Sequence, residues 1–193
     1  PMPIGETASN FCETIVGKAA LKSASPTQKI AILESALSNA TQVICDIYSR
    51  FLFESRFFEA RKQGLVNAEE TKKIMLEAQI EAYGDGLDHN YLHPYMWTWK
   101  PHYYDSDYSF YNYPYAFGLL LAKGLYVRYQ QDPEHFPDDY ETFLSVTGKM
   151  DLEDIAKTLD IDLTDESFWQ SSIDIIKEDI VTFKSLLEEQ NHA

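Results

Sequence analysis

Apolar side chains recur every three or four residues along almost the whole of this chain, and this spacing restricts it to helical folds. No segment shows the sustained alternation of apolar and polar residues that is typical of a half-buried strand. The periodicity therefore predicts an all-α, multi-helical fold. A length of 193 residues is enough to bury one sizeable core, so we expect a single helical domain over residues 1–193.

Breaks in this periodicity divide the chain into expected helices, and proline, glycine and capping residues mark most of the boundaries. We expect helices over residues 7–23, 26–61, 68–83, 116–129, 137–146, 152–159 and 166–189. The interval 91–115 has a different character, because it holds eight of the 13 tyrosines and is interrupted by prolines. We expect this interval to form a structured loop that leads into a helix.

The charge of the chain excludes two classes of partner. The sequence has 31 acidic and 16 basic residues, a formal net charge of -15, which disfavours binding to nucleic acid or to an anionic membrane surface. The longest apolar run, residues 116–122, is far shorter than the roughly 20 residues that span a bilayer. We therefore expect a soluble protein that binds neither nucleic acid nor membranes.

The cysteines and the N-terminus indicate where the protein works. Cys12 and Cys45 have no metal-ligand spacing and lie in helical patterns, which suits a reducing, cytoplasmic setting. The first twenty residues lack the basic and apolar segments of a signal peptide. Because the chain begins at Pro1 and enters an apolar helix at once, we expect its N-terminus to be a cut end.

The first segment with possible chemistry is Gly5-Glu6-Thr7-Ala8-Ser9. A glutamate at the start of a helix is commonly a solvated residue that interacts favourably with the helix dipole. In a pocket, the same carboxylate can be a metal ligand. Glu13 lies seven residues further on and shares the helix face of Glu6. The local pattern leaves both interpretations open.

The second segment runs from residue 100 to residue 118. If its backbone is helical, Tyr108, Tyr111 and Tyr115 share one face, near His102. Phenol and imidazole groups can donate hydrogen bonds to an oxygen that develops negative charge, as in an oxyanion-stabilising site. Tyrosines also pack in cores and at interfaces, so an aromatic core or a partner-binding surface is the alternative.

Together, the two segments resemble the thimet oligopeptidase and oligoendopeptidase F family of zinc metallopeptidases. The first resembling segment is Glu6-Thr7-Ala8-Ser9 with its continuation Phe11-Cys12-Glu13. The second is Pro101-His102-Tyr103-Tyr104 through Phe110-Tyr111-Asn112-Tyr113-Pro114-Tyr115-Ala116-Phe117-Gly118. The resemblance extends over essentially the whole chain and would correspond to the last third of a family member.

This resemblance implies a zinc-dependent endopeptidase that hydrolyses short peptides. It implies that Glu6 is the third zinc ligand, beside two histidines of an upstream H-E-x-x-H motif that this chain lacks. The implied site residues are His102, Tyr108, Tyr111 and Tyr115 for stabilising the oxyanion, Tyr104 and Tyr113 for substrate binding, and Glu13 for support or packing. The segment from residue 102 to 118 is longer than is usual in the family, so the role of each tyrosine stays open. We expect the chain to be inactive by itself, because one carboxylate cannot hold zinc tightly.

Two other functions agree with the same residues. The chain could be a non-catalytic, acidic helical interaction module whose aromatic cluster docks a peptide or a subunit. It could also be a paralogue that has lost zinc. The peptide preference and the oligomeric state are left open by the sequence.

Overall fold

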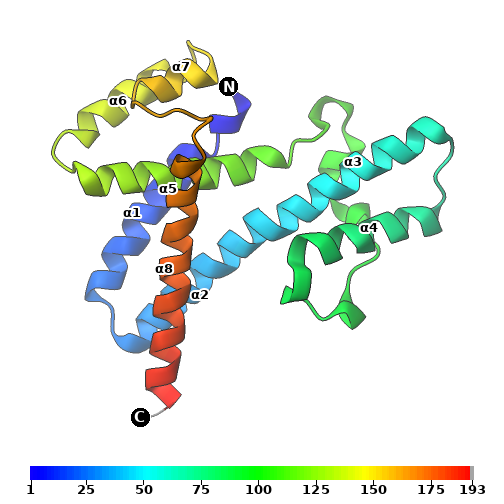
Figure 1. The fold of residues 1–193 in the computed structure, drawn as a ribbon, viewed down its shortest axis with the longest axis horizontal. Coiled ribbons are helices and arrows are strands. Elements are labelled where there is room, and N and C mark those ends of the chain that lie inside the picture. The colour runs from blue at the N-terminus through cyan, green and yellow to red at the C-terminus, as the bar shows by residue number, and fades with distance from the viewer. Residues whose placement is uncertain (192–193) are drawn as a thin grey trace. The chain divides into compact units, whose positions relative to one another are not determined.

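The computed structural model describes residues 1–191, except for the side chain of Tyr108. No strand occurs in this part of the chain, which confirms the all-α prediction (Figure 1). The α-helices are α1 (Thr7–Ser23), α2 (Pro26–Thr41), α3 (Ile47–Gln63), α4 (Ala68–Tyr83), α5 (Tyr113–Gln131), α6 (Phe136–Val146), α7 (Leu152–Lys157) and α8 (Glu166–Asn191). Among these residues, no helix is both long enough and apolar enough to cross a bilayer.

The chain divides into two compact units. Unit 1 comprises Pro1–Ala40 and Phe117–Ala193, and unit 2 comprises Thr41–Ala116. Both divisions fall inside helices, one at the end of α2 and one within α5. The single domain expected over residues 1–193 stays a prediction.

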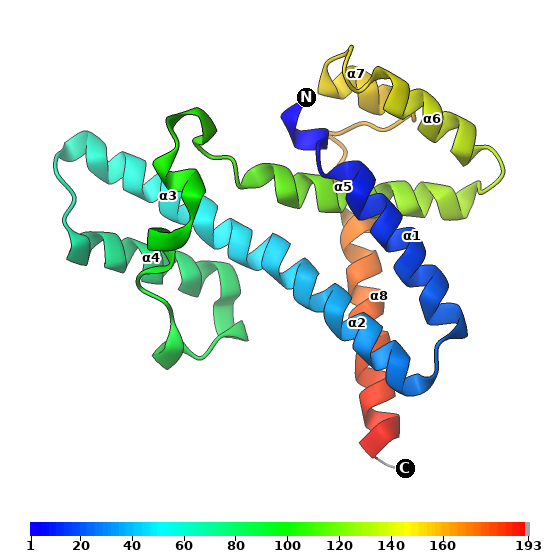
Figure 2. The same cartoon turned by 180° about the vertical axis from the view of Figure 1, so that it is seen from behind.

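Unit 1 has one apolar core, to which α1, α5, α6, α7 and α8 contribute. Its buried members are Ile4, Phe11, Leu121, Ala122, Leu125, Tyr126, Phe136, Phe143, Ile155, Ala156, Leu159, Ile161 and Ile175. Phe11 of α1 contacts the rings of Phe136 and Tyr140 of α6, with centroids 5.5 and 4.7 Å apart. Helices α6 and α7 lie side by side in both views (Figures 1 and 2). Each large side chain in this core contributes about 1.5–3 kcal/mol relative to an exposed one.

The long helix expected over residues 26–61 is present as a continuous helical run with one irregularity. Between α2 and α3, residues Gln42–Asp46 form a π-helix. A wider π turn keeps apolar residues three to five positions apart, so the apolar spacing could not distinguish it from an α turn.

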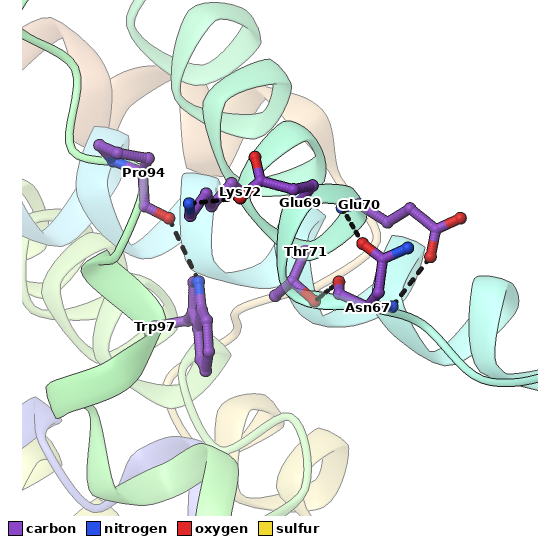
Figure 3. Close-up of polar contacts among 7 residues, drawn as sticks. All are labelled: Asn67, Glu69, Glu70, Thr71, Lys72, Pro94 and Trp97. Carbon is purple, nitrogen blue, oxygen red and sulfur yellow. Dashed lines mark hydrogen bonds and ion pairs between the residues drawn. The ribbon is translucent and has the colours of Figure 1, made fainter.

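In unit 2, α3 and α4 pack side by side, and a capping box begins α4 (Figure 3). The side chain of Asn67 accepts a hydrogen bond from the Glu70 N–H at 3.0 Å, and the Glu70 carboxylate accepts one from the Asn67 N–H at 2.9 Å. Such a cap typically contributes about 0.5–2 kcal/mol. Asn67 therefore caps the helix expected over residues 68–83, and Gly84, with φ of 52°, ends it.

The aromatic interval after α4 is an ordered loop, as expected. The whole connection from α4 to α5 contains five short 3-10 segments, η3 (Gly84–Gly86), η4 (His89–Tyr91), η5 (Met96–Trp99), η6 (Pro101–Tyr104) and η7 (Ser106–Tyr108). The buried amide of Gln79 holds the loop to α4, because it accepts from the His93 N–H and donates to the His93 carbonyl, both at 3.0 Å. The Trp97 indole N–H donates to the Pro94 carbonyl at 3.2 Å (Figure 3). Met96 and Tyr103 complete a second core with residues of α3 and α4.

The start of α5 corrects one expectation. The helix begins at Tyr113, so Tyr108 and Tyr111 precede it and do not share a helix face with Tyr115. The physical reason is Pro114, which lacks an N–H and therefore suits the first turn of a helix but not its interior. Just before the helix starts, Phe110 has a φ of 59°, which lies outside the range of a right-handed helix.

Candidate functional site

Glu6 lies at the N-terminal end of α1, in unit 1. Its backbone carbonyl accepts hydrogen bonds from the Asn10 N–H at 3.2 Å, from the Asn10 side-chain amide at 2.7 Å and from the Ser9 hydroxyl at 3.0 Å. Gly118 of α5 packs directly against its backbone and Cβ. The backbone of Glu6 is therefore held firmly, whereas its carboxylate makes no hydrogen bond to any described residue.

Glu6 is partly buried, and a carboxylate that makes no hydrogen bond to the described residues is a suitable metal ligand. A catalytic zinc needs three protein ligands. Within residues 1–191, no group of three or more histidine, cysteine, aspartate or glutamate side chains could hold a metal ion. Among the described residues, Glu6 therefore has no companion ligands that would complete such a site.

Three of the four residues expected to stabilise an oxyanion meet in unit 2. The His102 ring stacks on the Tyr111 ring, with centroids 5.5 Å apart and an interplanar angle of 12°. The Tyr115 ring meets both of them edge-on, at 6.2 Å from His102 and 5.9 Å from Tyr111. The Tyr115 hydroxyl lies 3.5 Å from His102 Nε2. The structure therefore brings His102, Tyr111 and Tyr115 into one cluster, although not along a helix face.

The environment of His102 favours its neutral form. Loss of solvent contact lowers its pKa, and the charges of Arg50 and Lys100 lower it further. Its Nδ1 is buried and has no hydrogen-bond partner among the described residues. A neutral imidazole next to a phenol can donate or accept a single hydrogen bond without carrying a charge.

Two of the other predicted tyrosines are exposed on the surface. The side chain of Tyr108 lies outside the described residues. Tyr104 and Tyr113, expected to bind substrate, are 64% and 45% exposed, so both are accessible. Glu13 is exposed on α1 and borders a cavity of about 390 Å³ in unit 1, together with Lys18, Lys123 and Asp179.

Helix α3 supplies supporting residues that the sequence analysis missed. Arg50 and Glu54 are 5% and 4% exposed, although both are charged. Arg50 forms an ion pair with Asp46, and its backbone carbonyl accepts a hydrogen bond from the Tyr103 hydroxyl at 3.2 Å. Glu54 binds the backbone of the aromatic loop. Charged residues four positions apart on an otherwise apolar helix face were the available signal.

Comparison with known proteins relates this chain to a group of peptidases. Residues 1–175 match the family model described as Peptidase family M3. Over 180 residues, the chain is 27% identical to the oligoendopeptidase F homolog of Borreliella burgdorferi, which corresponds to 89% of this chain and 29% of that relative.

A solved structure has the same fold. The crystal structure of oligoendopeptidase-F from Enterococcus faecium superposes with a TM-score of 0.84 at 16% identity, covering 98% of this chain and 36% of that one. The chain thus spans less than a third of the curated relative and slightly more than a third of the solved structure.

Proposed function

Because this chain belongs to Peptidase family M3, we propose that the whole protein is a zinc-dependent endopeptidase of short peptides and that this chain forms part of its active site. The oligoendopeptidase F relatives support the choice of substrate class. The observation that carries the proposal is the cluster of His102, Tyr111 and Tyr115, because peptide hydrolysis needs hydrogen-bond donors where the carbonyl oxygen becomes an oxyanion.

In this proposal, the His/Tyr cluster binds the peptide carbonyl. The Tyr115 hydroxyl and a ring nitrogen of His102 donate hydrogen bonds that become stronger as the carbonyl oxygen gains charge. Stacking on Tyr111 fixes the plane of the imidazole and hence the direction of its N–H. Tyr108 remains a candidate for the same role, and the exposed rings of Tyr104 and Tyr113 would contact the peptide.

Glu6 would be the single zinc ligand that this chain provides. Its fixed backbone, and a carboxylate without a hydrogen bond to the residues that the structure describes, support that role. A bound zinc would supply an activated water and polarise the peptide carbonyl. The two histidine ligands and the general base would come from an H-E-x-x-H motif elsewhere in the whole protein. We also place this protein in the cytoplasm, where the unpaired Cys12 and Cys45 would stay reduced.

The test measures cleavage of a short quenched peptide by the protein as its native gene encodes it. Removal of one oxyanion donor typically lowers kcat on the order of 100- to 1000-fold. We expect losses of this size for His102→Ala and Tyr115→Phe, with smaller changes in KM. Tyr91→Phe is the matched control, because Tyr91 is 85% exposed in the same unit. Unchanged kcat in both site variants would refute the proposed role.

The alternative is an interaction module, and the exposed aromatic rings favour it. Trp99, Tyr91 and Tyr104 are each more than half exposed, which suits docking of a peptide or a subunit. Glu6→Gln separates the functions, because only the peptidase loses bound zinc and activity, whereas a docking surface in unit 2 keeps its affinity. A paralogue without zinc would show neither cleavage nor metal in the unmodified protein.

A further inference from the structure

A buried carboxylate of α3 holds the loop that carries the His/Tyr cluster. Oε1 of Glu54 accepts a hydrogen bond from the Phe110 N–H at 2.7 Å, across 56 residues of sequence. Glu54 is 4% exposed, so water competes little for this bond. Because the acceptor is a carboxylate and the distance is short, this hydrogen bond is stronger than one to a neutral acceptor.

The side chain of Asn112, on the other side of Tyr111 in the sequence, also lies near the Glu54 carboxyl. Burial raises the pKa of the Glu54 carboxyl, while the Phe110 N–H and the nearby Asn112 amide lower it in part. The Asn112 amide is buried, and neither it nor Oε2 of Glu54 completes a hydrogen bond of normal geometry with a described residue. Glu54 thus lies beside both chain neighbours of Tyr111, with a bond to one and an electrostatic contact to the other.

The backbone at Phe110 needs such a restraint. Its φ of 59° is in the left-handed region, which a bulky side chain rarely adopts unless the surroundings impose it. Its ring stacks on Phe58, with centroids 5.3 Å apart, and contacts Phe51 at 6.0 Å, so α3 holds both the backbone and the side chain. The next residue, Tyr111, is the one that stacks on His102.

We propose that Glu54 is a positioning residue, which holds Phe110 in its left-handed conformation and thereby places the Tyr111 ring against His102. The catalytic consequence rests on the proposed function, but the positioning itself does not. In this proposal, Glu54 acts through its hydrogen bond to the backbone of the loop. Without Glu54, Phe110 would return to a common backbone conformation, and the Tyr111 ring would move away from the His102 ring.

The experiment compares Glu54→Ala and Glu54→Gln with Glu59→Ala, which removes an exposed glutamate of the same helix. Amide hydrogen exchange at Phe110 and the NMR signals of His102 are measured on the 193-residue chain, and kcat and KM on the protein as its gene encodes it. We expect Glu54→Ala to speed exchange of the Phe110 amide proton by at least about tenfold, because the hydrogen bond to Glu54 protects that proton from exchange with water. Glu54→Gln keeps an acceptor oxygen and should restore most of the protection, and Glu59→Ala should change nothing.

Each possible result supports or refutes one part of the proposal. If Glu54→Ala matches Glu59→Ala in both exchange and the His102 signals, positioning by Glu54 is refuted. If both change and kcat falls with little change in KM, the positioning and its catalytic consequence are supported. If both change and kcat does not, positioning stands and the catalytic role of the cluster is refuted. If Glu54→Ala fails to fold, Glu54→Asp takes its place. Its shorter side chain keeps the negative charge but moves it away from the Phe110 N–H, and the same outcomes apply.

Discussion

Gly118 of α5 packs against Glu6 so closely that no larger residue fits between them. A Cβ atom at position 118 would lie 2.7 Å from the Cβ of Glu6 and 3.2 to 3.3 Å from its backbone carbons. Backbone atoms cannot move aside as the end of a flexible side chain can. The missing side chain at position 118 therefore determines where the proposed metal ligand lies in unit 1.

The first prediction concerns this contact. Gly118→Ala should lower the free energy of unfolding by about 1–3 kcal/mol, because it overpacks a buried contact. In the protein as its gene encodes it, the displacement of Glu6 should also reduce zinc content, measured by elemental analysis. Gly17→Ala is the control, since a Cβ at Gly17 of α1 meets nothing within 4 Å.

Gly17→Ala should instead stabilise α1 by about 0.5–1 kcal/mol, because glycine is a poor helix former. Urea unfolding of both variants gives the comparison. Equal stability and equal zinc content in the two variants would show that Gly118 does not position Glu6.

The second prediction concerns the proton on His102. Its pKa should lie below the ordinary 6.5, first because of burial and then because of the Arg50 and Lys100 charges. Lys100→Met should move the pKa upward, since one of these charges is removed, whereas Lys73→Met at an exposed lysine should not. An NMR titration of the His102 ring measures both changes.

The lowered pKa of His102 also makes the stability of the chain depend on pH. The unfolded chain binds a proton at His102 more readily than the folded chain does. The stabilisation is therefore complete above pH 6.5 and is lost as the pH falls through the lower pKa of the folded state. A His102 midpoint at or above 6.5 would contradict this account.

The third prediction tests the attachment of the aromatic loop to α3. Tyr103→Phe removes the 3.2 Å hydrogen bond to the Arg50 carbonyl and should lower the free energy of unfolding by about 0.5–1.5 kcal/mol. Tyr91→Phe, at an exposed ring, should change it by less than about 0.5 kcal/mol. Denaturant unfolding measures both, and equal effects would rule out a contribution from this bond.

The fourth prediction concerns Tyr140, whose buried hydroxyl has no hydrogen-bond partner among residues 1–191. Burial raises the pKa of Tyr140 to about 12. Tyr140→Phe should be neutral or raise the free energy of unfolding by up to about 1 kcal/mol, because it removes an unsatisfied polar group while keeping the ring.

The pH dependence provides a second measurement on Tyr140. Because the folded state holds the phenol proton more tightly, this contribution to stability is complete below pH 10 and is lost as the pH rises through about 12. Tyr140→Phe should therefore lose less stability than the unmodified chain between these values. Destabilisation by the substitution at neutral pH would reveal a hydrogen bond to the hydroxyl.

The fifth prediction is that the 193-residue chain alone neither binds zinc tightly nor cleaves peptides. Within its described residues, Glu6 has no second or third ligand beside it. Calorimetric titration with zinc and a peptide assay with and without a chelator test this. Cleavage by the pure chain that the chelator abolishes would contradict it.

Local patterns were sufficient to predict the helices and several of their ends. The apolar spacing is repeated in each helix, and Asn67 and Gly84 mark the ends of α4 because a cap and a left-handed backbone are properties of single residues. The two segments around Glu6 and His102 indicated the family, which the match over residues 1–175 established. The candidate site residues came from that resemblance, since spacing alone left them open.

What the sequence determined by itself was therefore the all-α class and the residue types available for chemistry, because both are recorded locally. The folded structure alone revealed that His102, Tyr111 and Tyr115 meet after a left-handed backbone conformation at Phe110 instead of along a helix. It alone brought Glu54 to Phe110 and Gly118 to Glu6. These contacts join residues 56 and 112 positions apart, and packing over such separations leaves no periodic signal in the chain.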